Sequence, residues 1–333
     1  MKRRIQKINI IEFKNKKILL LCHENTDLDS FCSAAIFKEY LKRNKIESVI
    51  GVPSHINEQT TSFARKQKMS FIINPNLENF DLILLFDFND FEQLGFLRNN
   101  FKKLLLVKKI KVISFDHHFK EKRSIANGFI NPKKLSTTEL LFDLIGKSFN
   151  KKMFFYACLG MIEDTGRFLV GSKDFFESFS ICLKNSGKKY SEIFRITKHV
   201  PLEGEKIAFL KAIQRAKIIK IKNVVLITSK ISFYQGVIAT KLLEFGADIS
   251  IVCGLEKKGI TNLSARAETF FKEKNNFNLM KDLMIVLEKD FGGEIGGHSG
   301  AAQWKGIANE KEILKKAESV IKKFVIKKVI NNN

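Results

Sequence analysis

Four clusters of acidic and histidine residues along the chain have the composition of a metal site. They are the segments HENTDLDS at 23–30, LFDFND at 85–90, DHH at 116–118 and EDTGRF at 163–168. Their candidate ligands are His23, Asp27, Asp29, Asp87, Asp116, His117, His118 and Asp164. Carboxylates and imidazoles without a thiolate suit a divalent ion such as Mn²⁺ or Mg²⁺ better than a structural zinc. This many ligands exceeds what one catalytic ion with open positions needs, and it indicates two ions.

Such a two-ion site points to hydrolysis of a phosphoester. Two ions roughly 3.5–4 Å apart share a bridging carboxylate and a bridging water that becomes a hydroxide near neutral pH. The same ions hold the oxygens of a phosphate during in-line attack. Each segment alone has a simpler interpretation, since HENTDLDS is typical of a helix cap, a strand-end Asp87 of an N-cap and Asp164 before Thr-Gly of a turn. Their joint occurrence favours the metal interpretation.

The elements that position these side chains read as an α/β domain. Short apolar runs predict strands, and a helical stripe lies between the first two, over 31–41. The predicted strands are 16–22, 46–52, 81–87 and 111–116. Strands alternating with helices form a parallel sheet, and ligands bind beyond the carboxyl ends of its strands. His23, Asp87 and Asp116 each stand at such an end, so we expect them on one rim.

The remaining sequence predicts a second, smaller α/β domain. A buried helix over 151–162 is followed by a mixed helical segment over 174–200, which we expect to connect the domains. The later predicted elements are a helix over 205–220, strands over 223–229 and 247–255, a helix over 235–245 and an amphipathic helix over 310–329. We therefore predict a metal-binding domain at 1–190, a linker at 191–204 and a substrate-binding domain at 205–333, with the active-site cleft between the domains.

The four segments together resemble the DHH phosphoesterase superfamily. Its motifs run H-x-x-x-D-x-D, a strand-end Asp, DHH and D-T-G, and all four occur in this order across residues 23–168. The family usually has proline before the first Asp of the first motif, where this chain has Thr26. Proline at that position shapes the loop but supplies no ligand, so the ligand set stays complete.

This resemblance assigns roles to the clustered residues. It implies that His23 and Asp27 hold one Mn²⁺, that Asp29, His117 and Asp164 hold the second, and that Asp87 bridges the two. Mg²⁺ is the alternative ion. Asp116 is expected to orient His117. His118 is expected to face the scissile phosphate, and His118 and Asp29 are the implied catalytic residues.

A glycine-rich segment near the C-terminus, FGGEIGGHSGAA at 291–302, extends the resemblance to nearly the whole chain. Glycine lets a backbone approach an anion closely, although the segment alone is also typical of a flexible hairpin loop. It resembles the GGGH loop of the DHH-associated C-terminal domain, with an insertion typical of archaeal members. LSAR at 263–266 resembles that domain's S-x-R strand, whose guanidinium can hold a phosphate bidentately. The implied substrate-binding residues are His118, Ser264, Arg266, Gly296, Gly297 and His298.

The second domain narrows the predicted activity. Family II inorganic pyrophosphatases share the first four motifs but carry a different C-terminal domain, and cyclic-dinucleotide phosphodiesterases of the superfamily usually add membrane and sensory segments. RecJ-like exonucleases and nano-RNases remain, which trim short oligonucleotides and often remove a phosphate from pAp. We expect a manganese-dependent exonuclease that hydrolyses single-stranded RNA or DNA, or short oligonucleotides, to nucleoside monophosphates. The alternatives are a phosphatase for pAp-like nucleotides and a non-catalytic replication scaffold.

Composition adds one further indication. The net charge of +23 divides into +13 for residues 1–190 and +10 for 191–333. An excess spread in this way indicates a polyanionic partner, nucleic acid first, or compositional drift in a chain rich in Lys, Ile, Asn and Phe. Five scattered cysteines argue against disulfides and a zinc knuckle. No apolar run approaches the ~20 residues of a membrane helix, so we expect a cytoplasmic protein without membrane contact. The sequence is compatible with an oligomer.

Overall fold

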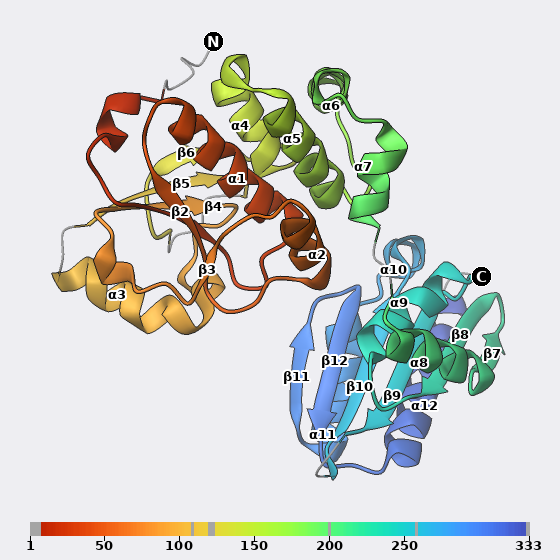
Figure 1. Cartoon of the computed structure of the whole chain (residues 1–333). Coiled ribbons are helices and arrows are strands. Elements are labelled where there is room, and N and C mark those ends of the chain that lie inside the picture. Colours follow the sequence, from red (N-terminus) through yellow and green to blue (C-terminus); the bar gives the residue numbers. More distant parts are fainter. Residues whose placement is uncertain (1–7, 108–109, 119–123, 199–200, 257–258, 331–333) are drawn as a thin grey trace. The chain divides into compact units, whose positions relative to one another are not determined.

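The computed structural model describes residues 8–107, 110–118, 124–198, 201–256 and 259–330. The chain divides into two compact units, Met1–Val200 and Pro201–Asn333 (Figure 1). Each unit has its own sheet and its own hydrophobic core. The five cysteines are buried and unpaired. Across the described ranges, no helix is both long and apolar enough to cross a membrane.

The first unit is built on a parallel sheet, as predicted. Within the described residues this sheet has six strands in the order β3-β2-β1-β4-β5-β6, and every neighbouring pair is parallel. The strands are β1 (Ile18–Cys22), β2 (Ser48–Val52), β3 (Ile72–Ile73), β4 (Leu82–Phe86), β5 (Lys111–Asp116) and β6 (Gly128–Ile130). The short edge strands β3 and β6 were not predicted, because two or three residues carry no periodic signal.

Helices cover both faces of this sheet, which explains why its central strands are apolar at every position (Figure 1). Leu20 and Cys22 of β1 pack toward α1, α4 and α5, whereas Leu19 and Leu21 pack toward α3. The helices are α1 (Leu28–Arg43), α2 (Glu58–Lys66), α3 (Arg98–Val107), α4 (Thr137–Ile145), α5 (Lys151–Asp164), α6 (Lys173–Ser186) and α7 (Tyr190–Thr197). Short 3₁₀ segments lie at Ile10–Phe13, Leu77–Asn79, Phe91–Leu97 and Gly146–Ser148.

The segment expected to connect the domains is folded structure of the first unit. Helices α6 and α7 both pack on α5. Helix α7 and the first residues of α8 occupy most of the stretch that we expected to be a linker, 191–204. The amphipathic stripe of α7, with Ile193 fully buried, explains why it docks instead of bridging.

The second unit has a mixed sheet in the order β11-β12-β10-β9-β8-β7 within the described residues, with β8 and β9 parallel. Its strands are β7 (Lys217–Ile221), β8 (Val224–Lys230), β9 (Ile249–Leu255), β10 (Thr261–Ala267), β11 (Glu294–Gly297) and β12 (Ala301–Gly306). Its helices are α8 (Glu203–Gln214), α9 (Gln235–Glu244), α10 (Thr269–Asn275), a π-helical turn (Met280–Met284), α11 (Ile285–Phe291) and α12 (Glu310–Ile330).

One predicted element of the second unit is wrong. The helix expected over 205–220 ends at Gln214, and Lys217–Ile221 forms strand β7. In KIIKI the buried residues are Ile219 and Ile221 while their neighbours are exposed, which is the period of a strand. The glycine-rich segment 291–302 contains strand β11, the turn after it and the first two residues of β12.

Candidate active site

The acidic and histidine clusters meet where the strand order of the first sheet reverses. Strand β1 lies between β2, which continues the sheet toward β3, and β4, which continues it toward β5. Ligands of open α/β sheets bind outside the carboxyl ends of the strands at such a switch point. His23 directly follows β1, Asp87 directly follows β4, and Asp116 is the last residue of β5. The expected delivery of charge to one rim is thus explained by topology.

His23, Asp27 and Asp87 form one group of candidate ligands. The Nε2 of His23 lies 3.5 Å from Asp27 Oδ1 and 3.6 Å from Asp87 Oδ2. The Nδ1 of His23 lies 2.6 Å from the Glu24 carbonyl oxygen, so Nδ1 donates there and Nε2 faces the carboxylates. Asp27 is also the N-cap of α1, accepting from Ser30 N at 3.0 Å. The capping interpretation of this segment and the ligand interpretation therefore both hold.

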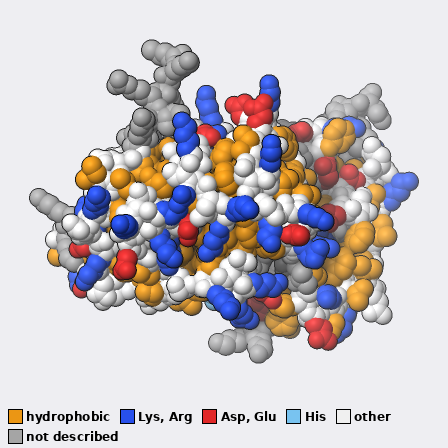
Figure 2. Space-filling model, turned by 45° about the horizontal axis from the view of Figure 1, so that its top comes forward, with side chains coloured by type: hydrophobic (Ala, Val, Ile, Leu, Met, Phe, Trp, Pro, Cys, Tyr) orange, Lys and Arg blue, Asp and Glu red, His pale blue; other side chains and the backbone are white. Residues whose placement is uncertain are grey.

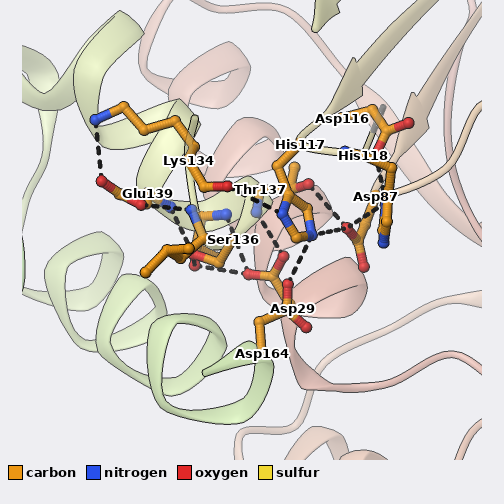
Figure 3. A network of polar contacts seen from close by, with 12 residues as sticks. Asp29, Asp87, Asp116, His117, His118, Lys134, Ser136, Thr137, Glu139 and Asp164 are labelled. Carbon is orange, nitrogen blue, oxygen red and sulfur yellow. Dashed lines mark hydrogen bonds and ion pairs between the residues drawn. The ribbon is translucent and has the colours of Figure 1, made fainter. Parts of the chain in front are cut away.

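Asp29, Asp87, His117 and Asp164 form the second group (Figure 3). The Nε2 of His117 lies 2.9 Å from Asp164 Oδ2 and 3.3 Å from Asp87 Oδ1. The Nδ1 of His117 lies 3.3 Å from the Lys134 carbonyl oxygen, which fixes the ring with Nε2 toward the carboxylates. Asp164 is the last residue of α5, so that helix presents it.

The carboxylate of Asp29 is bound by the N-terminus of α4 (Figure 3). Thr137 N donates to Asp29 Oδ2 at 2.7 Å, and Thr138 N and Thr138 Oγ1 donate to Oδ1 at 3.1 and 2.7 Å. The hydroxyl of Thr137 donates to Asp87 Oδ1 at 2.9 Å. Free N–H groups and the positive end of a helix dipole stabilise a buried negative charge.

Sequence reasoning missed these threonines, although S-T-T-E at 136–139 carries a signal. The pattern is that of a capping box, and Ser136 Oγ accepts from Glu139 N at 3.0 Å. Glu139 in turn accepts from Leu135 N at 2.8 Å and pairs with Lys134 at 3.0 Å. The cap could have been found, but the contact of the next two residues with Asp29 could not.

Asp116 has a different partner from the one expected. Its Oδ1 lies 2.7 Å from Nδ1 of His118 and 3.1 Å from the His118 backbone nitrogen. The ring of His117 is held instead by the Lys134 carbonyl, so the assignment of Asp116 to His117 is corrected. The His118 side chain is 54% exposed, and its hydrogen bond with Asp116 raises its pKa. Together with Asp87 and His117, His118 forms a third group of possible ligands.

Burial and mutual contacts shift the titration of the cluster. Burial lowers the pKa of His23, but its contacts with the carboxylates of Asp27 and Asp87 outweigh burial and raise the pKa to about 11. Burial likewise lowers the pKa of His117, and its close contacts with the carboxylates of Asp164 and Asp87 raise it to about 12. Burial and the charge of Asp87 raise the pKa of Asp164 to about 7. In the absence of a metal ion, these raised pKa values mean that bound protons reduce the repulsion among the clustered carboxylates.

Asp87 and Asp29 respond in opposite directions. Burial raises the pKa of Asp87, yet its close contacts with His117 and His23 dominate and lower it. Burial, followed by the charges of Asp164 and Asp87, raises the pKa of Asp29 well above its ordinary value. Asp87 also has a left-handed backbone, with φ of 68°. A buried aspartate in that conformation is unusual, and such strain is concentrated at functional sites.

The residues present fit a divalent ion. Each of the three groups offers ligand atoms that all lie within 4.8 Å of one another, and Asp87 belongs to all three. The atoms His117 Nε2 and Asp164 Oδ2 are buried and, although 2.9 Å apart, neither makes a well-aligned hydrogen bond with a described residue. Buried polar atoms left in this way indicate a missing partner.

Glycine at position 160 of α5 makes room for the cluster. A Cβ there would lie 2.2 Å from Asp29 Oδ1 and 2.5 Å from Thr138 Oγ1. Both neighbours are fixed by the hydrogen bonds between Asp29 and α4, so neither can withdraw cheaply. Gly160 is a third residue of the site that sequence reasoning missed, after Thr137 and Thr138.

The predicted substrate-binding residues of the second unit gather at one end of its sheet. Arg266 pairs with Ala301 across β10 and β12, and His298 lies in the turn just before Ala301, with His298 N bonded to Ala301 O at 2.8 Å. Ser264 lies two residues before Arg266, on the same face of β10. Gly297 has a φ of 127°, and a Cβ there would meet Ala301 O at 2.3 Å, so the turn requires glycine. No comparable contact surrounds Gly296.

Comparison with known proteins identifies the class. The fold is that of an exopolyphosphatase-related protein from Bacteroides fragilis, with a TM-score of 0.72, 18% identity and full coverage of both chains. An uncharacterized protein of Methanocaldococcus jannaschii is 25% identical over 334 residues, covering 96% of this chain and 95% of that protein. Residues 17–161 match the DHH family, N-terminal domain. Members of this family are divalent-metal-dependent phosphoesterases, and the match supports a hydrolase of phosphoester bonds.

The pKa shifts predict how metal binding depends on pH. His23 and His117 have folded pKa values above their ordinary 6.5, so the stability they contribute is complete below that value and declines as pH rises. The pKa of Asp164 is raised to about 7, so the stability that its protonated form contributes is lost as the pH rises from the ordinary pKa of an aspartate to about 7. The metal-free protein should therefore lose stability from about pH 6 to pH 9, while Mn²⁺, which replaces the protons, should raise Tm more at the higher pH.

Differential scanning fluorimetry with Mn²⁺ and with EDTA at each pH measures this difference directly. The subtraction cancels titrating groups elsewhere in the chain. A rise in Tm on adding Mn²⁺ that is equal at both ends of the range, or larger at low pH, would contradict the protonated state assigned to the cluster.

Gly160→Ala should destabilise the protein by roughly 1–3 kcal/mol, because the added methyl group overpacks Asp29 and Thr138. Gly204→Ala is the matched control, since Gly204 is also helical but a Cβ there would meet only Tyr234 Oη, at 3.8 Å. Replacing glycine in an open helical position is neutral or stabilising. Thermal melts of the two variants test the packing, and an equal effect of both substitutions would refute it.

Proposed function

We propose that the protein is a manganese-dependent phosphodiesterase that hydrolyses short single-stranded oligonucleotides to nucleoside monophosphates. The observation that carries this proposal is the sharing of Asp87 by all three ligand groups at the sheet's switch point. A carboxylate placed between two sets of ligands is what a pair of ions requires. The basic charge of both halves of the sequence favours a nucleic-acid substrate over a small uncharged one.

The proposal assigns the ions to the residues as the resemblance implied. His23 and Asp27 would hold one ion, Asp29, His117 and Asp164 the second, and Asp87 both. Bound Mn²⁺ would supply Lewis-acid chemistry, lowering the pKa of water and stabilising charge on phosphoryl oxygens. Asp29 has three of its acceptor positions taken by α4, so its orientation is fixed before any ligand arrives.

His118 is the group proposed to meet the substrate phosphate. Its Nδ1 is engaged by Asp116 at 2.7 Å, which leaves Nε2 as the free ring nitrogen. The raised pKa favours the protonated ring, a donor and a positive charge beside the cluster. A protonated imidazole at this point can hold a phosphoryl oxygen or donate a proton to the departing oxygen.

Arg266 and His298 are proposed to bind the nucleotide. The guanidinium of Arg266 is half-buried, its pKa is lowered by burial, and among the described residues it has no carboxylate partner. A half-buried cation without a counter-ion is suited to bind an anion. Gly236 of α9 leaves space beside it, since a Cβ there would lie 3.2 Å from the Arg266 Nη2.

Two other functions use the same residues. A phosphatase acting on pAp-like nucleotides would need the same ions and the same Arg266. A non-catalytic scaffold is disfavoured because the complete set of ligands converges in space. Assaying the protein with Mn²⁺ on labelled short RNA, short DNA and pAp separates these functions: cleavage of the oligonucleotides supports the proposal, turnover of pAp alone favours the phosphatase, and turnover of none favours the scaffold.

Asp87→Asn should reduce hydrolysis at least about 100-fold, because the amide loses the charge that both ligand groups share. The side chain keeps its size, so far-UV circular dichroism should be unchanged. Asp90→Asn is the matched control, since Asp90 is three residues further on and only caps a 3₁₀ turn, accepting from Glu92 N at 3.0 Å. Retained activity in Asp87→Asn with Mn²⁺ would rule out the shared carboxylate.

Arg266→Ala should lower kcat/KM for oligonucleotides about tenfold to a hundredfold, as expected for loss of a charge-assisted contact of roughly 1.5–3 kcal/mol. Because Arg266 is proposed to bind a part of the substrate remote from the reacting bond, nitrophenyl phosphate should be hydrolysed as before. Arg266→Lys keeps the charge but not the bidentate geometry, so its kcat/KM for oligonucleotides should lie between those of the wild type and Arg266→Ala. Equal loss on both substrates, or loss of bound manganese, would contradict this role.

A further inference from the structure

A concave surface of the second unit gathers basic side chains that the proposed active site does not use. Its volume is about 640 Å³, and it is formed by the residue after α8, strands β7 and β8, and one face of α12. The cations that line it are Arg215, Lys217, Lys230, Lys311, Lys315 and Lys322. We call this surface the basic groove.

Helix α12 lines up three of these cations. Lys311, Lys315 and Lys322 are spaced by four and seven residues, which places them on one face of the helix. They are exposed, while Ile313, Ala317 and Ile321 on the other side are fully buried against the sheet. At 1.5 Å per residue the row of lysines spans roughly 16 Å. A row of this length can contact several successive phosphates of an extended chain.

Most of the positive charge in the groove is uncompensated. Glu318 is the one acidic residue lining it, and this carboxylate accepts from Lys217 Nζ at 2.7 Å and from Thr228 Oγ1 at 3.0 Å. The other five cations form no ion pair with any residue in the described part of the chain. Elsewhere in this unit, surface lysines do find partners, as Lys241 does with Glu244 at 2.8 Å.

Basic side chains are common over the molecule, so their number alone means little. Figure 2 shows Lys and Arg scattered singly over one face, with hydrophobic side chains between them. In the basic groove, by contrast, cations from four separate elements line one hollow. Like charges gathered in a concavity repel one another and raise the local concentration of anions.

The groove is separate from the predicted nucleotide-binding residues of the same unit. Side chains alternate between the two faces of a sheet. Thr228 of β8 contacts Glu318 of α12, so the groove lies on the α12 face. Leu263 and Ala265 of β10 pack in the core with α12, which leaves Ser264 and Arg266 on the face covered by α9. The two sets of residues therefore lie on opposite faces.

We propose that the basic groove binds a chain of phosphate groups, such as the backbone of a single-stranded nucleic acid, apart from the active site. Among the described residues, its lining has cations and the hydroxyl of Ser319 but no aromatic ring. Backbone phosphates are thus contacted without base stacking, and binding is independent of sequence. Inorganic polyphosphate presents the same chemistry and is the other source of such a chain.

Fluorescence anisotropy of a labelled twelve-nucleotide oligo-dT, with EDTA present to prevent hydrolysis, tests the proposal on the full chain. The groove variant is Lys311→Gln/Lys315→Gln/Lys322→Gln. The matched control is Lys206→Gln/Lys211→Gln/Lys220→Gln, three exposed lysines of the same unit outside the groove. The slope of log Kd against log salt should fall by about 2 in the groove variant, at roughly 0.7 per phosphate contact, and should change little in the control.

Unlabelled polyphosphate and unlabelled oligo-dT serve as competitors that distinguish the two sources. Competition by both assigns the groove to phosphate chains in general, and competition by oligo-dT alone assigns it to nucleic acid. Both variants should hydrolyse a dinucleotide at the same rate. A failure of the groove proposal is therefore distinguishable from a failure of the proposed hydrolytic activity. Equal losses of affinity and slope in the groove and control variants would overturn the proposal. Binding would then depend on the net charge of the protein and not on the position of the lysines.

Discussion

Repulsion among buried carboxylates is the constraint on which the first unit depends. Asp29 and Asp87 are almost completely buried, and Asp164 lies in contact with the same histidine as Asp87. Such a cluster is unstable unless positive charge or donors surround it. Two histidines, the N-terminus of α4 and two threonine hydroxyls supply that compensation in the structure. Each of these devices also fixes the direction in which a carboxylate points, so stability and preorganisation arise from the same contacts.

The fold and the outline of the site follow from local patterns in the sequence. The apolar runs ending at His23, Asp87 and Asp116 define strands, and parallel strands bring their carboxyl ends to one rim. The contacts of Thr137, Thr138 and Gly160 with Asp29 could not be read in the same way, since more than a hundred residues separate them from it. The partner of Asp116 depends on the conformation of the loop after β5, which the tripeptide DHH does not determine.

Strand β7 shows that a local sequence pattern can also be ambiguous. Its KIIKI sequence gives three apolar positions to either a short helix or a strand, and antiparallel pairing with β8 decides between them. The predicted linker meets a related limit, because an amphipathic helix such as α7 has the same sequence whether it packs on a domain or connects two domains.

The two units divide the chemistry between them. The first unit carries every candidate metal ligand and defines the class of reaction. The second carries Arg266 and the basic groove, two cationic features with few carboxylates to neutralise them, and His298. Substrate length and type are therefore expected to depend on the second unit, and bond cleavage on the first.

The central claim is that Asp87 is shared by two ions. Electron paramagnetic resonance of protein titrated with Mn²⁺ tests it without reference to activity, together with the stoichiometry of bound metal. The account predicts two Mn²⁺ per chain and a spin-coupled signal that disappears in Asp87→Asn. One bound ion per chain, or two ions whose signals are uncoupled, would contradict it.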